Sequence, residues 1–449
     1  MRLRFDAYLL KTVWALTWPT VTYSVLESLV GLADVYMVGR LGKDAVSGVG
    51  LSNQVLMLVM VGAFAVTAGT TTLVAQFVGA GNREEAGETG RQALLAMFAV
   101  SWLIAIPMVL LSGAALRAMG APQAALTHGV PYMRIVFGGV VVTSLNFASS
   151  AVFRGAGDMI TPLKIAAGVN VLNVVLNYLY IFGPGPFPAL GAAGAAVGTV
   201  VSRGIGGLTA VYLLSRPGGL IDVRWANGFR FRGDLLRRML RIGLPAAGTG
   251  LLRNGSRTLF FRVVTATASA AVALPALTVA FRVRMIVVFP ALGFQVAATT
   301  LVGQAIGRGD RDQAERLGWE AVKLCAVIMF VLSGIMFVGA WPLTKFFHKD
   351  PTVYASSLQV LRFVAVGQVF SAIAIAAGGA LAGAGDTRPA FVYTAITEWL
   401  LTLPTAYVLA NVVGLDAAGA WWPLAIAPVV QAALLVGRFA GGKWRRIIL

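Results

Sequence analysis

The sequence is poor in charge, cysteine and histidine. Charged residues make up 12% of the 449 positions, against about 25% in an ordinary soluble domain, which excludes a soluble protein built around one core. The single cysteine, Cys325, excludes an intramolecular disulfide framework and a multi-cysteine metal site. Two isolated histidines make no metal site either. We therefore expect no metal and no cofactor.

Apolar residues are abundant instead, and they fill 58% of the chain. At about 20 residues per membrane-spanning helix, this supply is enough for about twelve or thirteen spans. A helix-length window finds twelve apolar stretches, separated by connectors rich in glycine, proline and charge. Their approximate bounds are 13–37, 50–77, 93–111, 132–153, 162–182, 190–214, 238–262, 274–302, 319–341, 356–381, 390–412 and 418–438. The predicted fold class is an all-α polytopic membrane protein.

The basic excess indicates how the chain lies in the membrane. It carries 36 Lys and Arg against 18 Asp and Glu, a net charge of +18. About two thirds of the basic residues fall in the termini and alternate loops of one side, which marks that side as cytoplasmic. We expect a multi-pass protein of a prokaryotic-type inner membrane with both termini in the cytoplasm. Charge spread over several loops predicts contact with the lipid bilayer and not with nucleic acid.

An internal repeat divides the chain into two halves. Laid over 300–318, residues 72–90 are identical at nine of nineteen positions, at a shift of 228 residues. We expect an amino-terminal six-helix lobe over 1–215, a cytoplasmic linker over 216–237 and a carboxyl-terminal six-helix lobe over 238–449. Because six is an even number, the lobes should be related by a pseudo-twofold axis along the membrane normal, as in transporters with a cavity between two bundles.

Several motifs follow one another along essentially the whole chain: Leu32-Ala-Asp34, Val38-Gly-Arg-Leu-Gly42, Val74-Ala-Gln76, Phe153-Arg-Gly-Ala-Gly-Asp158, Asn173-Val-Val-Leu-Asn177 and Gly191-Ala-Ala-Gly-Ala-Ala-Val-Gly-Thr199. Together they resemble the multidrug and toxic compound extrusion family of the multidrug/oligosaccharidyl-lipid/polysaccharide exporter superfamily. Each is weak alone, and the set is specific. The resemblance implies two six-helix lobes around a V-shaped cavity and export of diverse, often cationic amphipathic compounds in exchange for protons or sodium.

Three acidic residues lie inside the predicted spans: Glu27, Asp34 and Glu398. A carboxylate at mid-membrane costs about 2.5 to 3.5 kcal/mol on insertion scales, so each needs a function or a partner. Asp34 is the first candidate for binding the coupling ion or proton, and the alternative is a carboxylate satisfied by backbone or by a neighbouring arginine. The resemblance assigns ion coupling to this aspartate, and a helix bend to the proline fifteen residues earlier, Pro19.

Asparagines follow one face of the fifth span, where Asn170, Asn173 and Asn177 are spaced by three and four residues. The resemblance places Asn173, Asn177 and Thr199 around the ion site of Asp34. Many microbial members carry an aspartate where this chain has Asn177, and one carboxylate fewer favours H+ over Na+ as the coupling ion. The alternative for these amides is hydrogen bonding between helices.

Arginines are concentrated in the second half, where Arg253, Arg257 and Arg284 lie inside spans. One interpretation pairs them with Glu27 or Glu398 across the cavity. Another is a positive carboxyl-terminal lobe that favours anionic or zwitterionic cargo. Four amides, Gln54, Asn146, Gln295 and Gln368, are candidates for the rest of the path, although a lone amide in a span more often joins helices.

The sequence thus predicts a monomeric secondary antiporter that exports small amphipathic compounds by alternating access. The alternative is a flippase or exporter of lipid-linked or anionic metabolites that uses the arginine-rich lobe. A membrane enzyme is not expected, because the chain has no nucleophile-elbow, zinc-protease or phosphate-loop motif.

Overall fold

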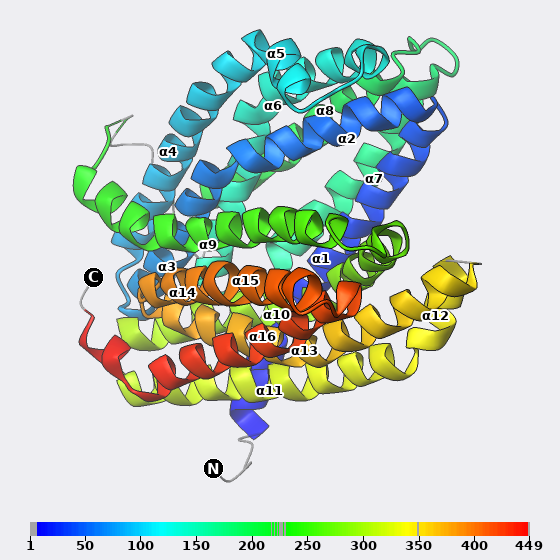
Figure 1. The fold of residues 1–449 in the computed structure, drawn as a ribbon. Helices are drawn as coiled ribbons and strands as arrows, with labels where there is room; N and C mark the ends of the chain where they lie inside the picture. Colours follow the sequence, from blue (N-terminus) through cyan, green and yellow to red (C-terminus); the bar gives the residue numbers. More distant parts are fainter. Residues whose placement is uncertain are drawn as a thin grey trace. The chain divides into compact units, whose positions relative to one another are not determined.

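The computed structural model describes residues 7–216, 218–219, 221, 223, 228, 230–347 and 350–447, and all regular secondary structure in this part of the chain is helical (Figure 1). The chain forms two compact units. The N-unit is Thr22–Ala247, and the C-unit is Met1–Val21 together with Gly248–Leu449. The lobe boundaries expected from the repeat, 1–215 and 238–449, differ from this division, and they remain a prediction.

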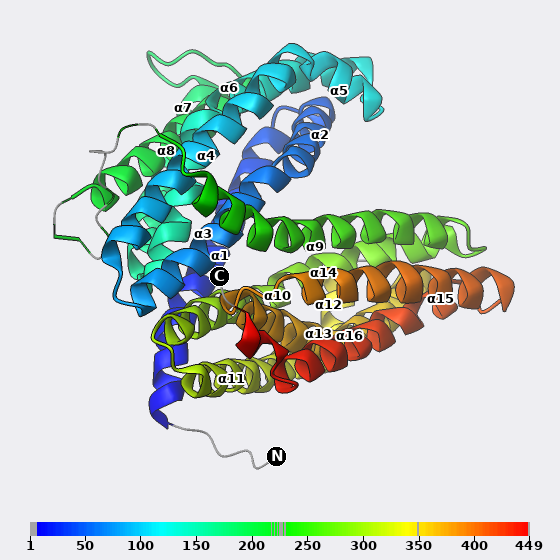
Figure 2. The same ribbon diagram turned by 90° about the vertical axis from the view of Figure 1, so that its left-hand side faces the viewer.

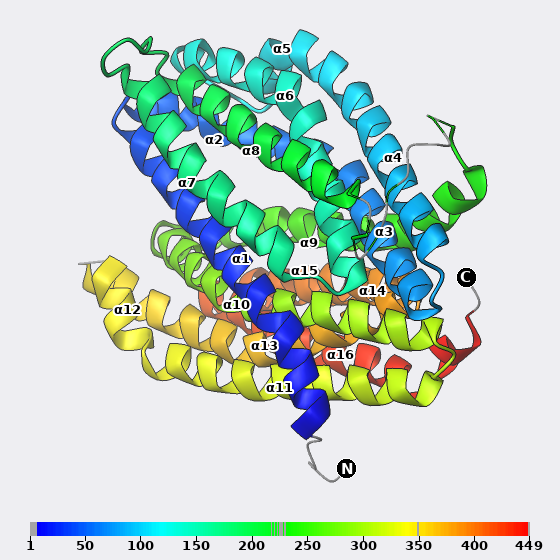
Figure 3. The ribbon, with the colours of Figure 1, turned by 180° about the vertical axis from the view of Figure 1, so that it is seen from behind.

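The N-unit contains most of the first long helix and seven further helices, in which α6 packs against α2, α3, α4 and α8 (Figure 3). Their bounds are α1 (Ala7–Gly39), α2 (Lys43–Val59), α3 (Val61–Gly79), α4 (Arg83–Leu110), α5 (Ser112–Ala118), α6 (Gln123–Ala156), α7 (Ile160–Phe182) and α8 (Ala192–Leu214).

In the C-unit, α13 packs against α10, α11 and α16 (Figure 2). The helices are α9 (Gly233–Thr265), α10 (Ala270–Gly307), α11 (Arg311–Val338), α12 (Ala340–Phe347), α13 (Pro351–Gly383), α14 (Arg388–Thr394), α15 (Leu403–Tyr407) and α16 (Asp416–Ala440). Two π-helical segments flank α15, η1 (Ala395–Thr402) and η2 (Val408–Val412), and a 3-10 turn, η3 (Lys443–Arg446), follows α16.

All twelve predicted spans correspond to helices, and the structure refines two of them. The second span is broken at Met60 into α2 and α3. The eleventh is the run from α14 to η2, in which Pro404 has no N–H and the N–H of Leu403 bonds to the carbonyl of Glu398 five residues back. Within the described residues, ten helices are long and apolar enough to cross a membrane. The remaining two predicted spans are the arginine-rich α9 and this interrupted run.

Helices α1 and α9 each pass from one unit to the other. Near the start of α1, Leu9 and Val13 belong to the hydrophobic core that Phe294 and Met329 form in the C-unit. The first half of α9 packs on α3 in the N-unit at backbone distance, since a Cβ at Gly243 would lie within 1.8 Å of a carbonyl of α3. Small residues allow such close approach where lipid supplies no hydrophobic drive between helices.

The repeat appears as the same turn in both units. Gly81 and Gly309, 228 positions apart, take positive φ values of 73° and 79°, a conformation that glycine adopts without strain. The next residues, Asn82 and Asp310, cap the following helix by accepting the N–H three residues on, at 3.0 and 2.8 Å. These motifs therefore recur because each ends one span and starts the next.

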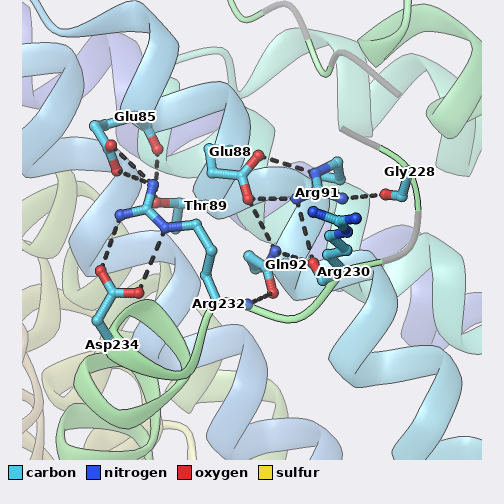
Figure 4. Close-up of polar contacts among 9 residues, drawn as sticks. All are labelled: Glu85, Glu88, Thr89, Arg91, Gln92, Gly228, Arg230, Arg232 and Asp234. Atoms are coloured by element: carbon cyan, nitrogen blue, oxygen red, sulfur yellow. Dashed lines mark hydrogen bonds and ion pairs between the residues drawn. The ribbon is translucent and has the colours of Figure 1, made fainter. Parts of the chain in front are cut away.

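The segment that joins α8 to α9 is fastened to the start of α4, within the N-unit (Figure 4). Gln92, which is fully buried, donates from Nε2 to the carbonyl of Arg230 at 2.9 Å and accepts the N–H of Arg232 at 3.0 Å. The guanidinium of Arg91 donates to the carbonyls of Gly228 and Arg230 while it pairs with Glu88. Arg91 and Gln92 thus provide hydrogen-bond partners for backbone groups of Gly228, Arg230 and Arg232 in the linker.

Arg91, Gln92 and Arg232 form a clamp that holds the linker on α4, and Arg232 adds an ion pair to each side of it. Its guanidinium lies 2.9 Å from Glu85 of α4 and 2.9 Å from Asp234 in the first turn of α9. Hydrogen bonds from Arg232 hold the pKa of the Asp234 carboxyl below its usual value. The described part of the linker is therefore held against α4 by hydrogen bonds and ion pairs.

The C-unit ends in the corresponding way. After α16, Trp444 is buried, donates from Nε1 to the carbonyl of Phe439 at 2.8 Å and stacks on the Phe439 ring at 5.2 Å. Arg445 pairs with Asp312 at 3.0 Å and also with Glu315, both in the first turns of α11. By the repeat shift of 228 residues, α11 is the equivalent of α4. In each half, the segment after the last helix therefore binds to the start of the equivalent helix.

Candidate functional site

Asp34 lies near the end of α1 and is half-buried in the N-unit. The Nδ2 of Asn177, on α7, lies 2.6 Å from Oδ1 of Asp34. Among the described residues of the N-unit, the other oxygen of Asp34 has no hydrogen-bond partner. The carboxylate is therefore held by one amide donor and keeps an oxygen free for a proton.

A chain of hydrogen bonds leads from Asp34 into the unit. Asn177 Nδ2 also donates to Oδ1 of Asn173 at 3.2 Å, one turn back on α7. The Nδ2 of Asn173 donates in turn to the hydroxyls of Thr199 at 3.2 Å and Ser202 at 3.3 Å, both on α8. The four residues predicted for ion coupling are thus brought together, and Ser202 joins them.

Glycine at position 198 allows this arrangement. The side-chain Oδ1 of Asn177 points at Gly198 of α8, where an added Cβ would lie 2.1 Å from Oδ1 and 2.9 Å from the backbone nitrogen of Asn177. Asn177 is fully buried, and its Oδ1 has no hydrogen-bond partner in the described part of the chain. The carboxylate of Asp34 accepts from the amide nitrogen of Asn177, and Gly198 leaves room for the amide oxygen on the opposite side.

Glu27 is paired within its own unit. Its carboxylate lies 3.1 Å from the guanidinium of Arg203 on α8, and about a third of each side chain is exposed. The charge of Arg203 also acts on Asp34. The interpretation that pairs Glu27 with arginines of the second half remains a prediction. Arg203 was not among the residues singled out from the sequence. A signal was present, since Arg203 lies four residues after Thr199 and so on the same helix face.

A second polar cluster lies in the C-unit. Arg253 and Arg257 are on α9 and Arg284 is on α10, and the charges of both α9 arginines and of Glu398 act on Arg284. Arg284 Nε donates to Oε1 of Gln368 on α13 at 3.2 Å. Glu398, in η1, accepts a hydrogen bond from Ser256 at 2.9 Å. Glu398 therefore shares a cluster with the arginines of its own unit.

The other candidates are dispersed. Gln54 on α2 is exposed, and Asn146 on α6 accepts from Ser150 at 3.3 Å, a contact within its own helix. Gln295 on α10 is half-buried, and its backbone carbonyl accepts from Thr299 at 2.9 Å. Pro19 is buried inside α1, which continues through it, two residues before the boundary between the units. None of these residues belongs to the two clusters among the described contacts.

The sequence model of the MatE family matches residues 19–179 and 245–408, one stretch in each half of the chain. The chain belongs to the MatE family. MATE proteins are membrane transporters, so the expectation that this chain is no enzyme is confirmed by its family. The resemblance seen in the motifs is confirmed as well.

Named relatives agree with the MATE assignment over nearly the full length. The chain is 30% identical over 447 residues to the probable multidrug resistance protein NorM of Thermotoga maritima, covering 97% of this chain and 93% of the relative. It is 26% identical over 439 residues to the uncharacterized transporter YisQ of Bacillus subtilis, covering 96% and 94%.

Solved structures share the MATE fold. A crystal structure of a MATE protein in its bent conformation superposes with a TM-score of 0.89 at 23% identity, covering 99% of both chains. A transporter from Pyrococcus furiosus, described as having a binding pocket of reverse polarity, superposes with a TM-score of 0.89 at 22% identity over 100% of both chains. At this identity the likeness establishes the fold alone.

Proposed function

We propose that this MATE protein is a secondary antiporter that exports amphipathic compounds, driven by cation entry with H+ favoured over Na+. One observation carries the proposal. Among the described residues of its unit, Asp34, a carboxylate inside a predicted membrane span, is held by a single amide donor and keeps one oxygen without a hydrogen-bond partner. A proton on that oxygen removes the charge without displacing Asn177. A site that gains and loses charge at a fixed position suits ion coupling.

The orientation of the amides supports H+ over Na+. Na+ is a hard cation and takes several oxygen ligands. Next to Asp34, Asn177 presents its nitrogen, and the oxygen of Asn173 already accepts a hydrogen bond. The hydroxyl of Thr199 accepts from Asn173 as well. A sodium ion here would have to break this chain, whereas a proton leaves it intact.

The driving force is sufficient for export. One charge that moves inward gains about 2.3 kcal/mol per 100 mV of membrane potential, and each pH unit adds about 1.4 kcal/mol. One proton therefore supports roughly hundredfold or greater accumulation of cargo outside. No further cofactor is needed.

In the proposed transport cycle, the two halves of the protein move so that the cargo site opens first to one side of the membrane and then to the other. Proton binding and release at Asp34 would accompany the change between inward-open and outward-open states, with the cargo site open to one side at a time. The name of the Thermotoga maritima relative supports drugs or toxic compounds as cargo. We expect a monomer in the inner membrane with both termini in the cytoplasm, as the loop charges indicate.

A second candidate function is export or flipping of lipid-linked or anionic compounds. The three arginines of the C-unit favour it, because they outnumber the single carboxylate of their cluster. Arginines repel a cationic dye, whereas they bind a phosphate or a carboxylate through charge-assisted hydrogen bonds. In this case the C-unit would bind cargo while Asp34 still coupled the ion.

Transport under separately clamped gradients tests the proposal. Purified protein is reconstituted into liposomes, and efflux of a cationic dye is followed with either a pH gradient or a sodium gradient imposed while the other is clamped at zero. Efflux with the pH gradient alone is expected. Efflux that needs sodium and ignores the pH gradient would contradict H+ coupling, and anion export without dye export would favour the second function.

A further inference from the structure

The arginine cluster of the C-unit lies well inside its helices, away from their ends. At 1.5 Å per residue, Arg253, Arg284, Gln368 and Glu398 lie roughly 15 to 22 Å along their helical runs from the nearer end. A charged side chain in the interior of a membrane span needs a partner inside the protein.

The partners present do not balance the charge. Three guanidinium groups, Arg253, Arg257 and Arg284, share the cluster with one carboxylate, Glu398. Ser256 already donates a hydrogen bond to one oxygen of that carboxylate at 2.9 Å. Arg257 is exposed, whereas Arg253, Arg284 and Glu398 are half-buried. Positive charge therefore exceeds negative charge around Arg284, and charges of one sign that are withdrawn from water are costly unless an opposite charge accompanies them.

The side chain of Gln368 marks the position where an anionic group would contact Arg284. Its side chain is 1% exposed, and its Oε1 accepts a hydrogen bond from Arg284. Its Nε2 has no hydrogen-bond partner in the described part of the chain. If the amide oxygen and nitrogen of Gln368 were exchanged, its NH2 group would face the N–H of Arg284. The hydrogen bond from Arg284 therefore fixes which end of the amide is the oxygen. A buried donor without a partner, beside a guanidinium without an opposite charge, favours binding of an acceptor at this position.

We propose that Arg284, Gln368 and Arg253 form a binding site for an anionic oxygen group, a carboxylate or phosphate, carried by an amphipathic molecule. The guanidinium of Arg284 and the Nε2 of Gln368 donate to this group, and Arg253 supplies the second charge. Arginine forks match carboxylate and phosphate oxygens in geometry and charge. Glu398 is the resident anion of the cluster and competes with the ligand for the arginines.

This site has the opposite polarity to the site in the N-unit. There, Glu27 and Arg203 neutralise each other and Asp34 remains as an acid. By the repeat shift of 226 that carries Pro19 onto Pro245, Glu27 corresponds to Arg253. The inference rests on the proposed function only in treating the occupant as cargo, since binding itself requires no transport.

Binding of two related dyes to the full-length protein in phosphatidylcholine nanodiscs tests the site. Carboxyfluorescein carries the anionic group, and rhodamine 6G has a similar ring system with a positive charge. Fluorescence polarisation should show tighter binding of carboxyfluorescein. Arg284→Gln should weaken carboxyfluorescein binding about tenfold or more, because a hydrogen bond to a charged group is lost. Glu398→Gln should tighten it, because the resident competitor loses its charge.

The matched control is Arg362→Gln, because Arg362 is exposed on α13 and lies over the ring of Phe337, 5.3 Å from its centroid. It should leave both affinities unchanged. Wild-type affinity in Arg284→Gln overturns the proposal. Should that variant fail to fold, Glu398→Gln decides, and unchanged or weaker carboxyfluorescein binding in it overturns the proposal equally.

Two further arms identify the source of the anion and separate the proposals. Phosphatidylglycerol added to the nanodiscs competes with carboxyfluorescein if a lipid headgroup is the natural occupant, and it has no effect if a soluble acid is. Asp34→Asn should retain carboxyfluorescein binding. Loss of proton-driven efflux with intact anion binding supports both sites, and intact efflux in Asp34→Asn contradicts the antiport proposal alone.

Discussion

Asn177 turns the nitrogen of its amide toward Asp34, with Nδ2 2.6 Å from Oδ1 of the carboxylate. The amide oxygen points instead at Gly198 on the neighbouring helix. A donor that faces a carboxylate stabilises its negative charge and offers no oxygen to a metal ion. This orientation, set by the hydrogen bond to Asp34 and accommodated by Gly198, is the structural basis for favouring protons.

Asn177→Asp should create a sodium response. The substitution replaces the donor nitrogen by an oxygen and adds a second carboxylate next to Asp34, and two carboxylates attract a hard cation. We expect dye efflux from liposomes to become stimulated by an imposed sodium gradient. The control is Asn170→Asp on the same helix face, about 10 Å away. Sodium-independent efflux in Asn177→Asp would contradict this account of ion selectivity.

Gly198→Ala should disturb the site through packing. The added Cβ meets the backbone nitrogen of Asn177 at 2.9 Å as well as its side chain, and a backbone atom cannot move aside without separating α7 from α8. We expect a loss of about 1 to 3 kcal/mol in stability, measured as a lower thermal midpoint in detergent, together with slower proton-driven efflux. Gly168→Ala on α7, where a Cβ meets nothing within 4 Å, is the control. Equal behaviour of both variants would contradict the packing argument.

The pair of Glu27 and Arg203 should act as one unit. Removing either charge alone leaves the other uncompensated, and because about a third of each side chain is exposed, we expect a cost below the about 3 to 5 kcal/mol of a fully buried pair. The double variant Glu27→Gln with Arg203→Gln should be more stable than the sum of the single changes predicts. Additive effects in thermal unfolding would show that the pair is not coupled.

Gln92→Leu should release the linker from α4. The substitution leaves the carbonyl of Arg230 and the N–H of Arg232 without their side-chain partner, and each unsatisfied buried group costs about 1 to 3 kcal/mol. Trypsin should then cleave within 216–232 faster than in wild type. Gln313→Leu at the exposed start of α11 should leave the cleavage rate unchanged, and equal rates in both variants would contradict the clamp.

The number and order of the spans could be predicted because each is a long apolar run between turn residues. The break at Met60 could not, since no proline or glycine occupies that position. The π-helical winding around Glu398 depends on how a whole span packs around Pro404. Local sequence does not determine such packing. The short helices α5 and α12 were missed because they are too brief to show a period.

The candidate site was predictable where residues share a helix face or a family motif. Asp34, Asn173, Asn177 and Thr199 come together as the resemblance implied. The partner of Glu27 could not be predicted, because Arg203 lies 176 residues away and only the tertiary fold joins them. Likewise, the unpaired nitrogen of Gln368 is a property of packing that a lone glutamine in an apolar run does not reveal.

Coupling of ion entry to export at Asp34 is tested by efflux of a cationic dye from liposomes after a sudden pH gradient. Asp34→Asn is compared with wild type and with Asp44→Asn in the first turn of α2. We expect gradient-driven efflux in wild type and Asp44→Asn, and no response to the gradient in Asp34→Asn. Undiminished gradient-driven efflux in Asp34→Asn would show that Asp34 is not the coupling residue.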